Sequence, residues 1–182
     1  MTEPTIRARE GYARCMGDTG QSAIERAIVT DTIGSLRLGP AIHRPADTTL
    51  KEVVEIMQRE HIGCMLLVDG DGLLCGIFTE RDLLNKVAGR KLDWAKERVS
   101  SFMTREPETL RPDDRIVWAL NLMSMGGYRH VPLVDRAGRP VGVVSIKDIV
   151  EFIVDLFPDA VLNLPPDPHR EPGSDDVGGG ED

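Results

Sequence analysis

Hydrophobic and polar positions along this chain predict the same order of elements twice. Apolar residues recur at helical spacing in residues 50–57 and again in residues 116–123. Each segment is followed by a short apolar run, a turn containing aspartate and glycine, and a second apolar run that leads into another helical pattern. Since short apolar runs between turn signals are typical of buried strands, each copy is predicted to form a helix, two strands and a second helix.

The two copies are related by an offset of 66 residues. The first strands are CMLLV at 64–68 and HVPLV at 130–134, and the second strands are LCGIF and PVGVV. The turns between them read DGDG and DRAG, and the second helices begin at Thr79 and Ser145. The register slips by one residue only in the loop before the first helix. These matches predict a tandem repeat of one structural unit.

Each copy has only about 55 residues, which is marginal for an independent hydrophobic core. We therefore expect the two copies to pack together as one pseudo-symmetric α+β domain. The end of the chain is rich in proline, glycine and acidic residues, a composition typical of disorder. The predicted organisation is an N-terminal extension with a short helix at 21–30 (1–32), a first motif (33–90), a connector (91–98), a second motif (99–160) and a disordered acidic tail (161–182).

The segments GIFTERD (76–82) and GVVSIKD (142–148) repeat one turn. In each, a strand ends at a hydroxyl residue, Thr79 or Ser145, and an aspartate follows three residues later. One interpretation is a helix capping box, in which hydroxyl and carboxylate satisfy backbone N–H groups. The other is a nucleotide site, because the carboxylate can accept both hydrogens of a ribose diol while the helix start favours phosphate. Both can hold at once, since a cap orients the carboxylate that binds.

The charge of the chain argues against several classes of partner. The formal net charge is −8, and residues 165–182 contribute −5 of it through six acidic residues and one arginine. Without a basic face, neither nucleic acid nor an anionic membrane surface is an expected partner. No apolar run approaches the roughly 20 residues of a membrane span, so no membrane insertion is expected. The N-terminal residues are polar and lack a signal-peptide core.

Candidate catalytic and metal-binding residues are scarce. The four histidines and three cysteines show no metal-ligand spacing, and the sequence contains no GxSxG motif. The DGDG segment at 69–72 is better explained as a hairpin turn than as part of a calcium loop. Because the cysteines are odd in number and unpatterned, a reducing cytoplasm is the predicted location. The chain is predicted not to be an enzyme and to hold no metal.

The full pattern resembles a known family. GIFTERD and GVVSIKD, preceded by the strands CMLLVD and YRHVPLVD and by the two matching helical segments, resemble tandem cystathionine β-synthase (CBS) domains. Such a pair is called a Bateman module, and the resemblance covers about residues 33–157. It implies an α+β fold in which each motif has a short leading strand before its helix–strand–strand–helix unit. It also implies two quasi-equivalent clefts, which in this family often bind AMP, ADP, ATP, S-adenosylmethionine or NAD.

The resemblance assigns residues to each cleft, with the aspartate turn of one motif facing walls from the other. The cleft that we name after Asp148 would consist of Ser145, Lys147, Asp148, Ser35, Ala41, Ile42, Ile62 and Gly63, with His130 reaching phosphate. The cleft that we name after Asp82 would consist of Thr79, Arg81, Asp82, Ser101, Pro107, Thr109, Tyr128 and Arg129. Ordinary surface ion pairs remain an alternative role for Arg129 and His130, as solvated helix charges do for Arg81 and Lys147. We expect one cleft to bind better, because YRH at 128–130 stands opposite IGC at 62–64.

The predicted function is a regulatory module that senses an adenosine-containing ligand and signals to an unknown protein partner. It requires no cofactor, and an adenine nucleotide or S-adenosylmethionine would be bound as the ligand. The alternative is a ligand-independent adaptor for dimerisation or docking, in which the turns act only as helix caps. A homodimer is expected, because modules of this family commonly pack through their helices. The candidates for that surface, or else for the intramolecular core, are Ile149, Phe152, Ile153 and Leu156.

Overall fold

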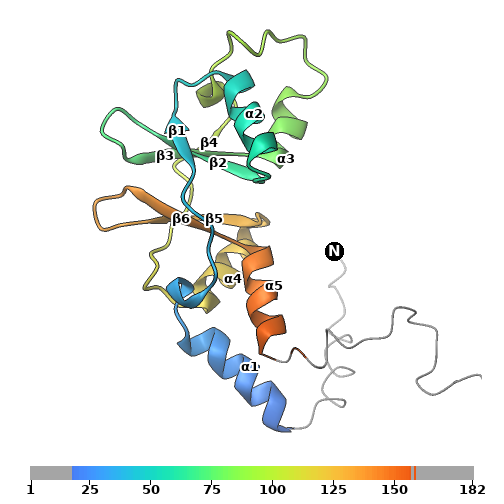
Figure 1. Ribbon diagram of the computed structural model, residues 1–182, viewed down its shortest axis with the longest axis vertical. Coiled ribbons are helices and arrows are strands. Elements are labelled where there is room, and N and C mark those ends of the chain that lie inside the picture. Colours follow the sequence, from blue (N-terminus) through green and yellow to red (C-terminus); the bar gives the residue numbers. More distant parts are fainter. Residues whose placement is uncertain (1–17, 157, 159–182) are drawn as a thin grey trace, which may run out of the picture.

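The structure, a computed structural model, describes residues 18–156 and residue 158. The predicted acidic tail at 161–182 and residues 1–17 of the predicted N-terminal extension lie outside the described residues. Within the described part, two sheets are stacked one above the other, with helices on their outer sides (Figure 1). This is the α+β architecture that the repeat predicts.

Each sheet is built around the strand pair of one copy, and the first sheet also takes its fourth strand from the start of the second copy. The first has the strand order β1-β2-β3-β4 and consists of β1 (His43–Pro45), β2 (Cys64–Val68), β3 (Leu74–Thr79) and β4 (Thr104–Arg105). β1 runs parallel to β2, and the other neighbours are antiparallel. The second sheet pairs the antiparallel strands β5 (His130–Val134) and β6 (Pro140–Ser145). The bounds of β2 and β5 confirm the strands predicted at 64–68 and 130–134.

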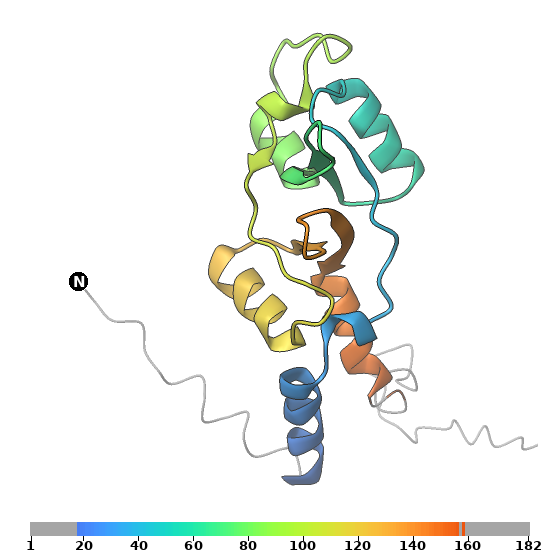
Figure 2. The same ribbon diagram turned by 90° about the vertical axis from the view of Figure 1, so that its left-hand side faces the viewer.

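Helices cover the outer face of each sheet. α2 (Leu50–Arg59) and α3 (Glu80–Asp82) lie on the side of the first sheet, and α4 (Ile116–Gly126) and α5 (Ile146–Asp155) on the side of the second, while α1 (Asp18–Thr30) contacts α4. Figure 2 shows α4 and α5 beneath the second sheet, with α1 below them. A single π-helical turn at 83–87 extends α3, so the second helix of the first motif is less regular than α5. The helix predicted at 21–30 begins earlier than expected, at Asp18.

Local sequence explains where α2 begins and which face it buries. The hydroxyl of Thr49 accepts a hydrogen bond of 3.3 Å from the backbone N–H of Glu52, which caps the helix start. Leu50 and Val53 are fully buried, and Met57, one turn further along, is nearly so. This spacing places the apolar side chains on one face, which packs against the first sheet.

The two hydrophobic cores exchange their leading segments, residues 33–36 and 99–103. Ile33, which opens the first copy, is fully buried in the core of the second copy. Val99, which opens the second copy, is fully buried in the core of the first. Backbone hydrogen bonds fix both crossings, from Ile33 N to Asp114 O at 2.8 Å and from Val99 N to Thr48 O at 3.0 Å. Each copy therefore completes the core of the other.

A third apolar cluster joins the two sheets. Cys64, Leu66 and Ile77 of the first sheet are buried, and Val143 of β6 packs against them. The inner faces of the sheets are thus in contact through side chains from both copies. Two cavities lie beside this contact, each lined by one of the two capped turns.

The residues proposed for a dimer surface on α5 divide into two groups. Ile149 is fully buried, and Phe152 and Ile153 are partly buried against the second core. These three residues therefore belong to the intramolecular core, which was the alternative to a dimer surface. Leu156, which directly follows α5, is 42% exposed, and Val150 on α5 is 51% exposed. Of the residues predicted for a dimer surface, Leu156 is exposed, and Val150, which was not predicted, is exposed as well.

Candidate functional site

Both repeated turns form a complete capping box. The N–H and hydroxyl of Thr79 donate to Asp82 Oδ2 at 2.9 and 2.7 Å, and Asp82 N donates to the Thr79 hydroxyl at 3.2 Å. The N–H and hydroxyl of Ser145 donate to Asp148 Oδ2 at 2.6 and 2.7 Å, and Asp148 N returns a bond of 3.3 Å. The capping interpretation is confirmed, and it holds each carboxylate in a defined orientation.

The Asp82 cavity has a volume of about 420 Å³. It lies between the capped turn of the first motif and two segments of the second, residues 104–108 and 126–132. Ser101 and Thr109 do not line it, although the sequence suggested them. The cavity brings together six of the residues assigned to this cleft: Thr79, Arg81, Asp82, Pro107, Tyr128 and Arg129.

Sequence reasoning missed several polar residues of the Asp82 cavity. Glu106 and Glu108 flank Pro107 and line the cavity with it. The hydroxyl of Tyr128 donates a hydrogen bond to Glu108 Oε2. Burial, this hydrogen bond and the charge of Glu108 raise the pKa of Tyr128 to about 12, so its hydroxyl stays protonated. At the 66-residue offset, both glutamates stand opposite uncharged residues, Pro40 and Ile42. This difference in charge between the two copies is the sequence signal that could have pointed to them.

The Asp148 cavity has a volume of about 440 Å³ and lies between the capped turn of the second motif and two segments of the first, residues 39–42 and 61–64. Ala41 does not line it, and Ser35 lies instead on a separate hollow of about 470 Å³ along α5. His61 and Pro40 are additional lining residues. The cavity brings together seven of the residues assigned to this cleft: Ser145, Lys147, Asp148, Ile42, Ile62, Gly63 and His130.

The two cavities meet at His130. Its half-buried ring, together with Gly63, Glu80 and Arg129, lines both cavities. A Cβ atom at position 63 would lie 3.1 Å from His130 Nε2, so glycine permits the close approach of the ring. Burial, and secondarily the charge of Arg129, lowers the pKa of His130, while Glu80 and Asp148 act in the opposite direction. The imidazole is therefore largely neutral at neutral pH.

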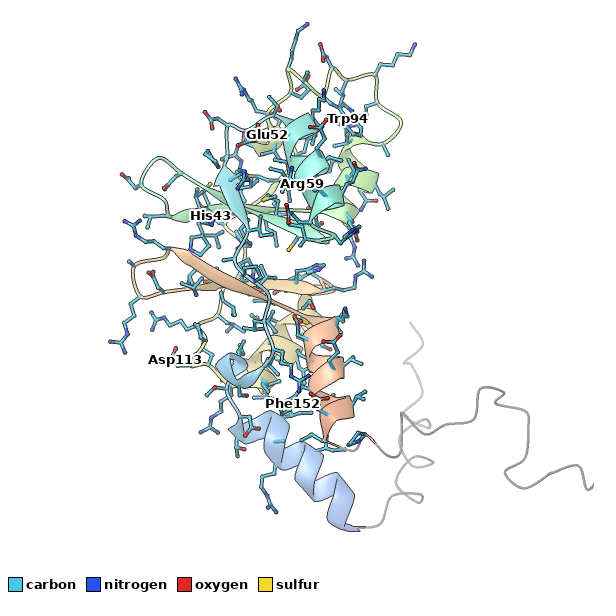
Figure 3. The ribbon with its side chains drawn as sticks, viewed as in Figure 1. His43, Glu52, Arg59, Trp94, Asp113 and Phe152 are labelled. Carbon is cyan, nitrogen blue, oxygen red and sulfur yellow. The ribbon has the colours of Figure 1, made fainter. Side chains whose placement is uncertain are left out.

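The two aspartates differ in the partners of Oδ1, the carboxylate oxygen that the caps do not use. Lys86 Nζ lies 2.7 Å from Asp82 Oδ1, and Thr104 Oγ1 lies 3.4 Å from the same atom. Phe152 occupies the position equivalent to Lys86 in the second copy (Figure 3). Among the described residues, Ser145 provides the only side-chain donor to Asp148, and its bonds go to Oδ2. Asp148 Oδ1 is thus available to a ligand, whereas Asp82 Oδ1 is held by a cation.

The cationic side chains near the cavities differ in the hydrogen bonds and ion pairs that they already make. Arg81 Nη1 donates to Gly127 O at 2.6 Å and so links the first motif to the second beside the Asp82 cavity. Lys147 pairs with Glu151 at 3.3 Å, and both side chains are largely exposed. Arg129 makes no ion pair or side-chain hydrogen bond with any described residue. Arg129 is therefore the guanidinium best able to turn toward a bound anion.

Other reactive chemistry is weakly supported in the described residues. No group of three or more histidine, cysteine, aspartate or glutamate side chains could hold a metal ion in that part of the chain. Burial, with the nearby charges of Glu80 and Asp148, raises the pKa of the Cys64 thiol to about 12, so it stays protonated. None of the described helices has both the length and the apolar character that a membrane span needs.

Comparison with known proteins identifies the family. The model of the CBS domain family matches residues 45–89 and 99–155. The chain belongs to the CBS domain family. CBS domain-containing protein CBSCBSPB5 of Arabidopsis thaliana is 36% identical over 126 residues, which are 69% of this chain and 22% of that protein. This chain thus spans about a fifth of the length of the curated relatives that it matches first.

Solved CBS domain structures share the fold. The CBS domain pair of protein MJ0100, in complex with 5′-methylthioadenosine and S-adenosyl-L-methionine, is 26% identical with a TM-score of 0.61, over 69% of this chain and 97% of that one. CBS domain protein PAE2072 from Pyrobaculum aerophilum, complexed with AMP, is 26% identical with a TM-score of 0.62, over 69% of this chain and 98% of that one. The predicted tandem CBS pair is confirmed.

Proposed function

We propose that this CBS pair is a regulatory, non-catalytic module that binds adenosine-containing ligands between its two motifs and signals their presence to a protein partner. One observation carries the proposal. Each cavity is lined by the capped carboxylate of one motif and by strand and loop segments of the other. A ligand there would contact both motifs at once. The similar CBS structures that hold methylthioadenosine, S-adenosylmethionine and AMP support the choice of ligand class.

The Asp148 cavity offers a complete set of groups for a nucleotide. Asp148 Oδ1 can accept hydrogen bonds from ribose hydroxyls, because Ser145 bonds only to Oδ2. Ile42 and Ile62 provide apolar surface for an adenine ring. The uncommitted guanidinium of Arg129 can face a phosphate, beside the N-terminus of α5. These contacts make the Asp148 cavity the principal nucleotide site of the proposal.

Signalling would follow from the position of the cavities between the motifs. A ligand shifts an equilibrium only when it binds one arrangement more tightly than another. A nucleotide held by Asp148 of one motif and Ile62 of the other favours the arrangement in which both contacts are made. The proposed output is therefore a change in how the two motifs are held together, which a partner protein reads.

Dimerisation, the protein partner and a cytoplasmic location remain predictions. Exposed apolar residues on the outer helices support a homodimer through this side of the molecule. Trp118 on α4 is 57% exposed, and Val150 on α5 is 51% exposed. Light scattering on wild type and on a Trp118→Glu/Val150→Glu variant tests the dimer, which the variant should dissociate. A wild-type chain that is monomeric at high concentration would remove dimerisation from the proposal.

Thermal unfolding with AMP, ATP, S-adenosylmethionine and NAD tests the function. A ligand at 100 times its dissociation constant should stabilise the fold by about 2.7 kcal/mol, and the Tm should rise by several degrees. Asp148→Asn should abolish the response to AMP. Thr49→Ala, which removes the cap of α2 away from both cavities, is the control for lost cap energy. A chain that responds to none of these compounds would instead support the ligand-independent adaptor.

A further inference from the structure

We propose that the two cavities select ligands of opposite charge. The Asp148 cavity takes an adenosine phosphate, whereas the Asp82 cavity takes an adenosine compound with a cationic substituent, such as a sulfonium nucleoside. This inference rests on the proposed function, because it assumes that both cavities hold adenosine compounds. The acidic side chains do not define the site, which is the cavity between the motifs. They decide which ligand enters it.

The charges that line the two cavities differ. The Asp82 cavity presents four carboxylates, those of Glu80, Asp82, Glu106 and Glu108, against the guanidinium groups of Arg81 and Arg129. The Asp148 cavity presents two carboxylates, those of Glu80 and Asp148, against Lys147 and Arg129. Since Glu80, Arg129 and the neutral His130 are shared, they do not distinguish the cavities. The difference comes from the residues that each cavity has alone.

Glu106 and Glu108 are the residues that create this difference. At the 66-residue offset, they stand where the Asp148 cavity has Pro40 and Ile42. The Tyr128 hydroxyl holds Glu108 in place, and the equivalent residue in the other cavity is Ile62, which has no donor. One wall is therefore anionic in the Asp82 cavity and apolar in the Asp148 cavity.

Lys86 does not cancel the negative charge of the Asp82 cavity. Its ammonium group lies against Asp82 Oδ1 and neutralises that carboxylate. Glu80, Glu106 and Glu108 then still outnumber the two guanidinium groups. A phosphate would enter against this excess, whereas a sulfonium or ammonium group would be attracted by it. Arg81 bonds to Gly127 O through Nη1, so its other N–H groups can meet the carboxylate that an amino-acid substituent carries.

The helix starts reinforce the distinction. α5 is a regular helix of ten residues, and its first residues Ile146 and Lys147 line the Asp148 cavity. α3 has a single turn of three residues before the π-helical turn. The longer and more regular α5 therefore gives the Asp148 cavity the stronger helix dipole for an anion.

Isothermal titration of the full chain with AMP and with S-adenosylmethionine tests the inference. Wild type should bind one molecule of each, and in saturating AMP it should still bind one molecule of S-adenosylmethionine. Asp148→Asn should lose AMP and keep S-adenosylmethionine. Glu106→Gln/Glu108→Gln should weaken S-adenosylmethionine by about tenfold or more and should bind AMP in a second cavity.

The matched control is Glu52→Gln/Glu55→Gln, which removes the same charge from exposed positions on the outer face of α2. It should titrate like wild type with both ligands. The inference is overturned if the two ligands compete for one cavity, if wild type binds two AMP molecules, or if the Glu106/Glu108 variant behaves like the control. If wild type binds neither compound, the proposed function fails as well, so the two failures are distinguishable.

Discussion

Lys86 Nζ lies 2.7 Å from Asp82 Oδ1, and the equivalent position beside Asp148 holds Phe152. The two turns are alike in their capping hydrogen bonds but differ in the partners of the second carboxylate oxygen. Asp82 is only 8% exposed, so leaving its carboxylate without a partner would be costly. Asp148 is left with an oxygen that a ligand can use.

Lys86→Met is expected to destabilise the fold by about 1–2 kcal/mol, because it leaves a largely buried carboxylate without its cation. Urea unfolding measures the change. Lys147→Met is the matched control, since Lys147 and its partner Glu151 are both largely exposed. That variant should change stability by less than about 0.5 kcal/mol. Equal effects of the two substitutions would show that the Lys86–Asp82 pair contributes no more than a surface pair.

Gly63→Ala is expected to disturb both cavities. The added Cβ would lie 3.1 Å from His130 Nε2 and 3.5 Å from Glu80 Oε2, so the shared imidazole must move. We expect a loss of stability of about 1 kcal/mol and weaker binding of every ligand that the wild type binds. Gly70→Ala is the control, because a Cβ there would meet no atom within 4 Å. Unaltered ligand affinities in Gly63→Ala would contradict a role for the His130 position in binding.

His130 should make the fold sensitive to acid. Burial and Arg129 hold its folded pKa below the ordinary 6.5, against the opposing charges of Glu80 and Asp148. The unfolded chain then binds this proton more readily, so stability is fully present above about pH 6.5 and is lost as pH falls through the folded pKa. The free energy of unfolding should fall less steeply in acid for His130→Gln than for wild type. The exposed His61, changed to glutamine, provides the comparison, and identical slopes in all three proteins would refute the expectation.

Ile33→Ala should destabilise the protein by about 3 kcal/mol, although residue 33 lies at the edge of the sequence repeat. Its side chain is fully buried in the core of the other copy, where the truncation leaves a cavity. Val29→Ala, four residues earlier and 41% exposed, is the control and should cost less than about 1 kcal/mol. Chemical unfolding of both variants distinguishes a core role for Ile33 from a linker role.

The elements of this fold are strongly predicted by local sequence. The strands at 64–68 and 130–134 appear as β2 and β5, because short apolar runs between turns leave few alternatives. Both capping boxes follow from a hydroxyl and an aspartate three residues apart. The exchange of the leading segments was not predictable in this way. Whether Ile33 enters its own core or the neighbouring one depends on tertiary packing, which hydrophobic periodicity does not encode.

The candidate site was predicted in outline. The capped turns and the shared residue His130 do line the cavities, while Ser35 and Ala41 do not line the Asp148 cavity. Assignments made by resemblance are least secure in loops, where a shift of one or two residues moves a side chain out of reach. The Lys86–Asp82 pair and the glutamates beside Pro107 each occur in one copy of the repeat and not in the other. They emerge only when the two copies are compared with each other and the contacts are known.

The crossed leading segments mean that this protein cannot be divided where its repeat divides. A cut in the connector at 91–98 would leave residue 33 on one fragment and its core on the other, with residue 99 in the reverse situation. Neither fragment should fold by itself, yet the two should recognise each other as complementary halves when mixed. The two copies therefore depend on each other for folding, because each supplies a buried segment that the core of the other needs.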